Sequence, residues 1–141
     1  MRNIRKIVVH CSATPATMDI GRDEIDRWHR ERKFNGIGYH LVIRRNGRLE
    51  RGRAMEKSGA HAKGYNSESV GVCLVGGTDS AGKAERNFTP RQYARLAEVL
   101  KGLQLVFPDA EVLGHRDLPG VAKACPCFDV KEWWKSKKEE A

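Results

Sequence analysis

Short apolar runs alternate along the chain with stretches that have helical spacing. Branched and aromatic residues concentrate in five runs that we expect to form β-strands, at 4–10, 39–44, 49–52, 69–75 and 111–115. Asn46-Gly47 lies between the second and third runs. Because both residues tolerate the positive φ angles of a tight turn, this dipeptide predicts a β-hairpin.

Three stretches predict helices: 22–33, 90 to about 107, and 129 onward. Asn35-Gly36 is the stop signal for the first of them. The second has the clearest start, because Thr89 can cap the helix and Pro90 suits its first position. Gln92 completes a capping box with Thr89, and Pro108 ends the helix.

The order of these elements, with a hairpin and crossovers, predicts an α/β fold. We expect a single domain over residues 1–141, with a central mixed β-sheet flanked by about three helices. The length of 141 residues suits one domain, and the 40% hydrophobic and 31% charged content excludes a disordered chain. No apolar stretch is long enough to insert into a membrane. The first apolar run is too short for a signal peptide, so we expect cytoplasmic synthesis.

The formal net charge is +8, which attracts polyanions such as nucleic acid, anionic lipid or anionic cell-wall polymers. The basic residues are scattered, and there is no zinc-finger or RNA-binding signature. A solvated basic surface is therefore the better interpretation, and we expect a monomer with no specific nucleic-acid partner.

Four cysteines occur, at positions 11, 73, 125 and 127. Without an export signal, metal binding or burial is expected for them rather than disulfides. Cys73 lies within an apolar run and reads as buried. Cys11 is expected to point into the core if His10, its neighbour on the strand, points toward a site. Cys127 could compete with Cys125 for a metal or simply pack.

His10 and His115 lie at the ends of predicted strands, and Cys125 follows in a loop. Two imidazoles, one thiolate and a water make the arrangement of a catalytic zinc, which lowers the pKa of such a water to about 7. The spacing alone is a weak signal, since nine residues separate His115 from Cys125. Structural roles for these side chains stay open at this point.

Six motifs in one order carry a resemblance to a known family: 9–14, 38–40, 61–66, 70–77, 87–90 and 123–126. Together they resemble the zinc-dependent N-acetylmuramoyl-L-alanine amidases, above all the small phage lysozyme-type amidases. That fold is shared with peptidoglycan recognition proteins. The resemblance covers nearly the whole chain.

The resemblance implies one Zn²⁺ per chain, with these ligands: His10, His115 and Cys125. It implies that Tyr39 and Lys123 are catalytic, and that His61 binds substrate. Lys123 would stabilise an oxyanion and Tyr39 would assist proton transfer. From the residues alone, Lys123 is one of many surface lysines, Tyr39 a core residue and His61 an exposed loop histidine.

Two further histidines are interpreted as structural. His40 alternates with Tyr39, so the two side chains are expected on opposite sides of their strand. His29 is expected to pack on its helix rather than bind a metal.

The implied reaction is hydrolysis of the amide that joins N-acetylmuramic acid to L-alanine in peptidoglycan. The leading hypothesis is a phage or prophage endolysin that reaches the cell wall after holin-type release. The alternatives are a non-catalytic peptidoglycan-binding module and a regulator of phage RNA polymerase. The stretch 116–122 looks longer than in the phage amidases, and a short N-terminal extension implicated there in polymerase binding is missing before the first strand. A polymerase partner is therefore doubtful.

Overall fold

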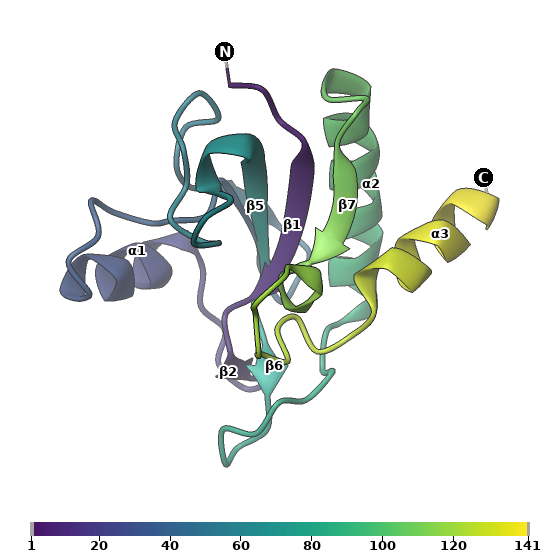
Figure 1. The fold of residues 1–141 in the computed structure, drawn as a ribbon. Helices are drawn as coiled ribbons and strands as arrows, with labels where there is room; N and C mark the ends of the chain where they lie inside the picture. Colours follow the sequence, from purple (N-terminus) through teal and green to yellow (C-terminus); the bar gives the residue numbers. More distant parts are fainter. Residues whose placement is uncertain (1, 141) are drawn as a thin grey trace.

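A computed structural model describes residues 2–140 and contains one five-stranded sheet (Figure 1). Its strands are β1 (Lys6–Cys11), β3 (Leu41–Ile43), β4 (Leu49–Arg51), β5 (Ser69–Leu74) and β7 (Glu111–Gly114). They lie in the order β4-β3-β5-β1-β7, with β4 antiparallel to β3 and the other pairs parallel. A separate short pair joins β2 (Thr14–Pro15) to β6 (Gly77–Thr78). The predicted mixed sheet and hairpin are confirmed.

Helices cover both faces of the sheet. They are α1 (Arg22–Glu31), α2 (Pro90–Val106) and α3 (Val130–Glu140), and two short 3₁₀ helices are η1 (Asn66–Glu68) and η2 (His115–Asp117). In Figure 1, α1 lies on one side of the sheet and α2 and α3 lie on the other. The expected α/β architecture with three flanking helices is confirmed for the described residues.

Alternation along β1 decides which side chains enter the main core. Ile7, Val9 and Cys11 point toward α2 and α3 and join the core there. Val8 belongs to a separate cluster on the opposite face. His10, two residues further along the strand, points to the same face as Val8. Burying each aliphatic side chain contributes about 1.5–3 kcal/mol, so a one-residue slip, which would exchange the two sets, is strongly disfavoured.

The start of α2 agrees with the sequence prediction. Thr89 Oγ1 accepts a hydrogen bond from the Gln92 N–H at 3.1 Å, and the Gln92 side chain accepts one from the Thr89 N–H at 3.0 Å. Leu96 and Leu100 are fully buried, as the helical spacing predicts. Asp129 precedes α3 and caps it, accepting from the Glu132 N–H at 3.1 Å.

Several predicted boundaries are wrong, among them that of the first strand, which spans Lys6–Cys11 rather than 4–10. Helix α1 ends at Glu31 rather than at residue 33, because Lys33 has a left-handed φ of 71°. The Lys33 N–H then bonds to the Arg30 carbonyl, and the Phe34 N–H bonds to the His29 carbonyl, which closes the helix before Asn35-Gly36. The strand expected at 39–44 is regular only over Leu41–Ile43.

The left-handed Lys33 gives a testable prediction about stability. Lys33→Gly should raise the free energy of unfolding by about 0.5–1 kcal/mol, because glycine adopts this φ without the steric cost that a Cβ imposes. Urea denaturation followed by circular dichroism measures the change. The matched control is Lys101→Gly on the exposed face of α2, which should lower stability by about 1 kcal/mol. A loss of stability in Lys33→Gly would contradict this account.

Candidate active site

His10 and His115 are neighbours because β1 and β7 run parallel. The ladder pairs Val9 with Gly114, so the next residues along the two strands lie side by side. The ring centroids of His10 and His115 are 4.5 Å apart. His10 is 2% exposed, whereas His115 is half-buried at the start of η2. Ligands commonly bind beyond the carboxyl ends of parallel strands, and the pair occupies that edge.

Cys125 reaches the two histidines from the loop between η2 and α3. The Arg116 N–H bonds to the Cys125 carbonyl at 2.8 Å, which draws the loop back toward β7. The Cys11 N–H donates to Cys125 Sγ at 3.2 Å. Sγ lies 4.0 Å from His10 Nδ1, and one ligand atom from each of His10, His115 and Cys125 lies within 4.8 Å of the others. The structure brings these three predicted ligands into one cluster.

The charge states suit metal binding. Burial, followed by the neighbouring histidines and Lys123, lowers the pKa of His10 well below 6.5. Burial and the charge of Lys123 lower the pKa of His115 as well. Both imidazoles are therefore neutral at pH 7, the state in which a ring nitrogen can bind a metal. Two imidazole nitrogens and one thiolate form a donor set that zinc accepts.

The other cysteines are less suited to be ligands. Burial and its neighbour Cys11 raise the pKa of Cys127 to about 11, and its Sγ donates to the Gly77 carbonyl at 3.2 Å. A hydrogen bond with Cys125, followed by burial, raises the pKa of Cys11 far above its ordinary value. Burial also raises the pKa of Cys73, which is fully buried as predicted.

His61 is not the exposed loop histidine that the residues alone allowed. Its ring is half-buried, and Nδ1 lies 2.8 Å from His10 Nε2. Its Nε2 lies 3.2 Å from Ser69 Oγ. Burial, followed by His40 and His115, lowers the pKa of His61 to about 3, so its ring is neutral. Sequence reasoning missed Ser69, although a serine at the start of an apolar strand was a visible signal.

Tyr39 and Lys123 approach the cluster from different segments. Tyr39, just before β3, places its ring centroid 5.1 Å from that of His10. Burial, followed by the neighbouring cysteines, raises the pKa of Tyr39 well above 10, so its hydroxyl stays protonated. Lys123 is exposed two residues before Cys125.

The histidines interpreted as structural make internal hydrogen bonds. His40 Nδ1 accepts from the Gly71 N–H at 3.0 Å, and His29 Nδ1 accepts from the Gly38 N–H at 2.8 Å. Strict alternation fails to separate His40 from Tyr39, because both residues precede the regular part of β3. The His40 ring lies 5.9 Å from that of His61, and the Tyr39 ring lies 5.1 Å from that of His10. The side chains of Tyr39 and His40 therefore both approach the site.

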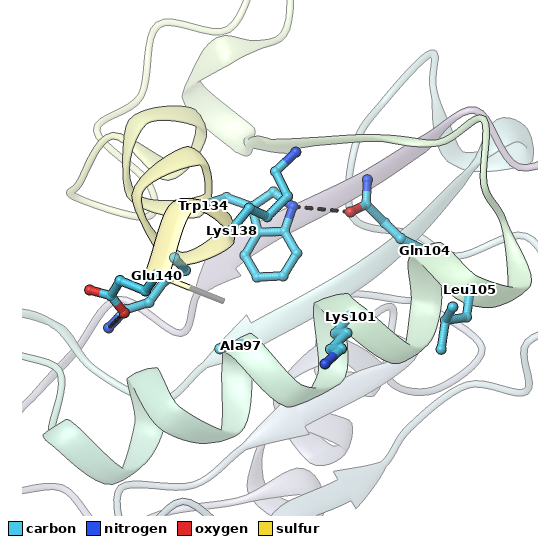
Figure 2. Close-up of a pocket in the computed structure, with 8 residues that line it drawn as sticks. Ala97, Lys101, Gln104, Leu105, Trp134, Lys138 and Glu140 are labelled. Atoms are coloured by element: carbon cyan, nitrogen blue, oxygen red, sulfur yellow. Dashed lines mark hydrogen bonds and ion pairs between the residues drawn. The ribbon is translucent and has the colours of Figure 1, made fainter.

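A cavity of about 520 Å³ lies elsewhere, between α2 and α3 (Figure 2). Trp134 and Leu105 contribute apolar surface, and Trp134 Nε1 donates to Gln104 Oε1 at 3.1 Å. Lys101 and Lys138 also line it. None of its lining residues is a histidine or a cysteine, so this cavity lacks the groups found at the carboxyl edge of the sheet.

The fold and the cluster agree with the family assignment. A family model described as N-acetylmuramoyl-L-alanine amidase matches residues 1–128, and the chain belongs to this family. The endolysin of Klebsiella phage KP32 is 51% identical over 129 residues, covering 92% of this chain and 84% of the relative. The endolysin of Escherichia phage T7 is 46% identical over 128 residues, which cover 91% of this chain and 83% of the relative. The amidase LysC from Clostridium intestinale has the same fold, with a TM-score of 0.84 and 28% identity over 98% of this chain and 87% of that one.

These similarities confirm the predicted family, fold and enzyme class, an N-acetylmuramoyl-L-alanine amidase. Within residues 2–140, no helix combines the length and hydropathy needed to cross a bilayer. The roles of individual site residues stay predictions.

The cluster predicts that Cys125, and not Cys127, is required for metal binding. Cys125→Ala removes one of three donors and should weaken Zn²⁺ binding by more than about 100-fold, beyond the loss typical of a change outside the ligand shell. Competition with a chromophoric chelator measures the affinity. Cys127→Ala is the matched control and should bind as the unmodified protein does. Equal losses in both variants would contradict the assignment.

Proposed function

We propose that this protein hydrolyses the amide between the lactyl group of N-acetylmuramic acid and L-alanine in peptidoglycan, with zinc as its cofactor. The observation that carries the proposal is the His10, His115 and Cys125 cluster in a chain of the amidase family. The three side chains offer metal ligands at one edge of the sheet, and the ring of Tyr39 lies beside that of His10.

In this proposal, His10, His115 and Cys125 hold one Zn²⁺ per chain. Held there, such an ion would supply a Lewis acid for the scissile carbonyl and a water of lowered pKa. The protein keeps both imidazoles neutral by burying them, so that neither ring must lose a proton before binding. The ligand set therefore supports zinc as the cofactor.

Tyr39 acts as a proton carrier in the proposed mechanism. Its raised pKa keeps a proton on Oη, where it can donate a hydrogen bond to the carbonyl oxygen or pass the proton toward the leaving amine. The ring is held between His10 and His29, with centroids 5.1 and 5.4 Å away. This packing limits the positions that the hydroxyl can reach.

Lys123 provides a positive charge for the oxyanion that forms when the carbonyl is attacked. Its charge contributes to lowering the pKa of both His10 and His115, after burial, so it acts on the cluster. A fixed cation near a developing negative charge stabilises the transition state more than the ground state. The role of His61 in substrate binding stays a prediction.

We further propose that the protein is a monomeric phage endolysin that reaches the cell wall through a holin-type lesion. Its relatives from phages KP32 and T7 are named endolysins. A net charge of +8 would draw the enzyme to anionic wall polymers, and salt would weaken this attraction.

Digestion of purified peptidoglycan tests the reaction directly. The zinc-loaded protein should release new amino termini on L-alanine, and a chelator should abolish the release because the ligands no longer hold the ion. End-group labelling and mass spectrometry identify the products. New reducing sugars in place of L-alanine termini would indicate a glycosidase and contradict the proposal.

Lys123→Ala should separate catalysis from metal binding. The variant is expected to bind Zn²⁺ normally but to lose about 100-fold or more in kcat/KM, because a stabiliser of the oxyanion is removed. Lys101→Ala, on α2 across the sheet, is the control for the loss of one positive charge and should retain activity. Full activity in Lys123→Ala would remove this residue from the mechanism.

A further inference from the structure

His61 uses both of its ring nitrogens inside the protein. Nδ1 lies 2.8 Å from His10 Nε2, and Nε2 lies 3.2 Å from Ser69 Oγ. His10 in turn directs its other nitrogen, Nδ1, toward Cys125 Sγ at 4.0 Å. Ser69, His61 and His10 therefore form a continuous hydrogen-bonded chain that ends at the cluster of predicted metal ligands.

The hydrogen-bonded chain of Ser69, His61 and His10 has one consistent arrangement of protons when His10 binds a metal through Nδ1. His10 Nδ1 must then be unprotonated, so Nε2 carries the proton and donates it to His61 Nδ1. His61 Nδ1 is consequently the acceptor, and its own proton lies on Nε2, where it donates to Ser69 Oγ. His10 thus determines the tautomer of His61, and the rotatable Ser69 hydroxyl accepts the remaining His61 proton.

The backbone around His61 is shaped to hold its ring in place. The N–H groups of His61 and Ala62 both donate to Asn66 Oδ1 at 2.9 Å. A Cβ on Gly71 would lie 2.7 Å from the His61 ring, and one on Gly59 would lie 2.5 Å from it, so the ring occupies the space that glycine leaves at both positions. The ring is therefore fixed on two sides.

Ser69, at the far end of the hydrogen-bonded chain, is held in place as well. Ser69 is fully buried at the start of β5, and the parallel register pairs it with Lys6 of β1. The same register places Ser69, Gly71 and Cys73 on the face of the sheet that carries His10. The two ends of the hydrogen-bonded chain, His10 and Ser69, thus lie on the adjacent strands β1 and β5, and only His61 comes from a loop.

We propose that His61 is a positioning residue: it accepts the His10 Nε2–H and thereby directs His10 Nδ1 at the metal, while its own Nε2–H donates to Ser69 Oγ. The inference rests on the proposed function only in taking zinc as the ion that His10 binds. In known metal sites, such partners orient the ligand and raise its basicity. With both nitrogens engaged, His61 has none left for the substrate.

Zinc affinity of purified variants tests the proposal without reference to activity. His61→Leu removes the acceptor and should weaken Zn²⁺ binding by about 10- to 100-fold. His61→Asn places an amide oxygen near the position of Nδ1 and should recover most of that loss. Ser69→Ala leaves the acceptor in place and should cost less than His61→Leu. The control is His29→Leu. His29 is buried and hydrogen-bonds to none of the three predicted metal ligands, so its loss should lower stability but leave zinc affinity unchanged.

The tautomers can be read in the unmodified protein, so the test does not depend on a variant that folds. Long-range ¹H–¹⁵N correlation spectra of the zinc-loaded enzyme should show His61 protonated on Nε2 and not on Nδ1. A proton on His61 Nδ1, or a folded His61→Leu that binds zinc with unchanged affinity, would overturn the proposal. Unchanged affinity with a raised KM would instead assign His61 to the substrate. An unmodified protein that binds no zinc would refute the proposed function itself.

Discussion

The parallel pairing of β1 with β5 on one side and β7 on the other is the contact on which the site depends. It sets His10 beside His115 at one edge of the sheet and on the same face as Ser69, Gly71 and Cys73 of β5. The register is held by the apolar side chains of β1 that enter the core with α2 and α3. Packing on one face of β1 therefore determines the chemistry on the other face.

Burying several polar rings at this edge costs free energy unless each finds a partner. Among the described residues, no buried side-chain nitrogen or oxygen lacks a hydrogen-bond partner. The histidines meet this demand largely with one another and with the backbone, and burial keeps them neutral. The same burial that stabilises the fold thus prepares imidazole nitrogens for a metal.

The reactive groups come from four separate segments: the end of β1, the residues before β3, the start of η2 and the loop that precedes α3. The first and third are held by the sheet and carry His10 and His115. The last carries Cys125 and Lys123, and backbone bonds from Arg116 and Cys11 anchor it to the strands. Rigid strands and an anchored loop together give the proposed mechanism its geometry. The cavity between α2 and α3, across the sheet, contributes none of these groups.

The sequence by itself determined the element types, the capping box of α2, the hairpin at Asn46-Gly47 and, through its motifs, the amidase family. These features depend on local spacing and turn chemistry, which can be recognised from the order of residues along the chain. Only the tertiary structure decided that Tyr39 and His40 both approach the cluster, and that His61 bonds to His10. Each of these depends on contacts between segments far apart in the chain. Strand register and loop closure set such contacts, and no local pattern encodes them.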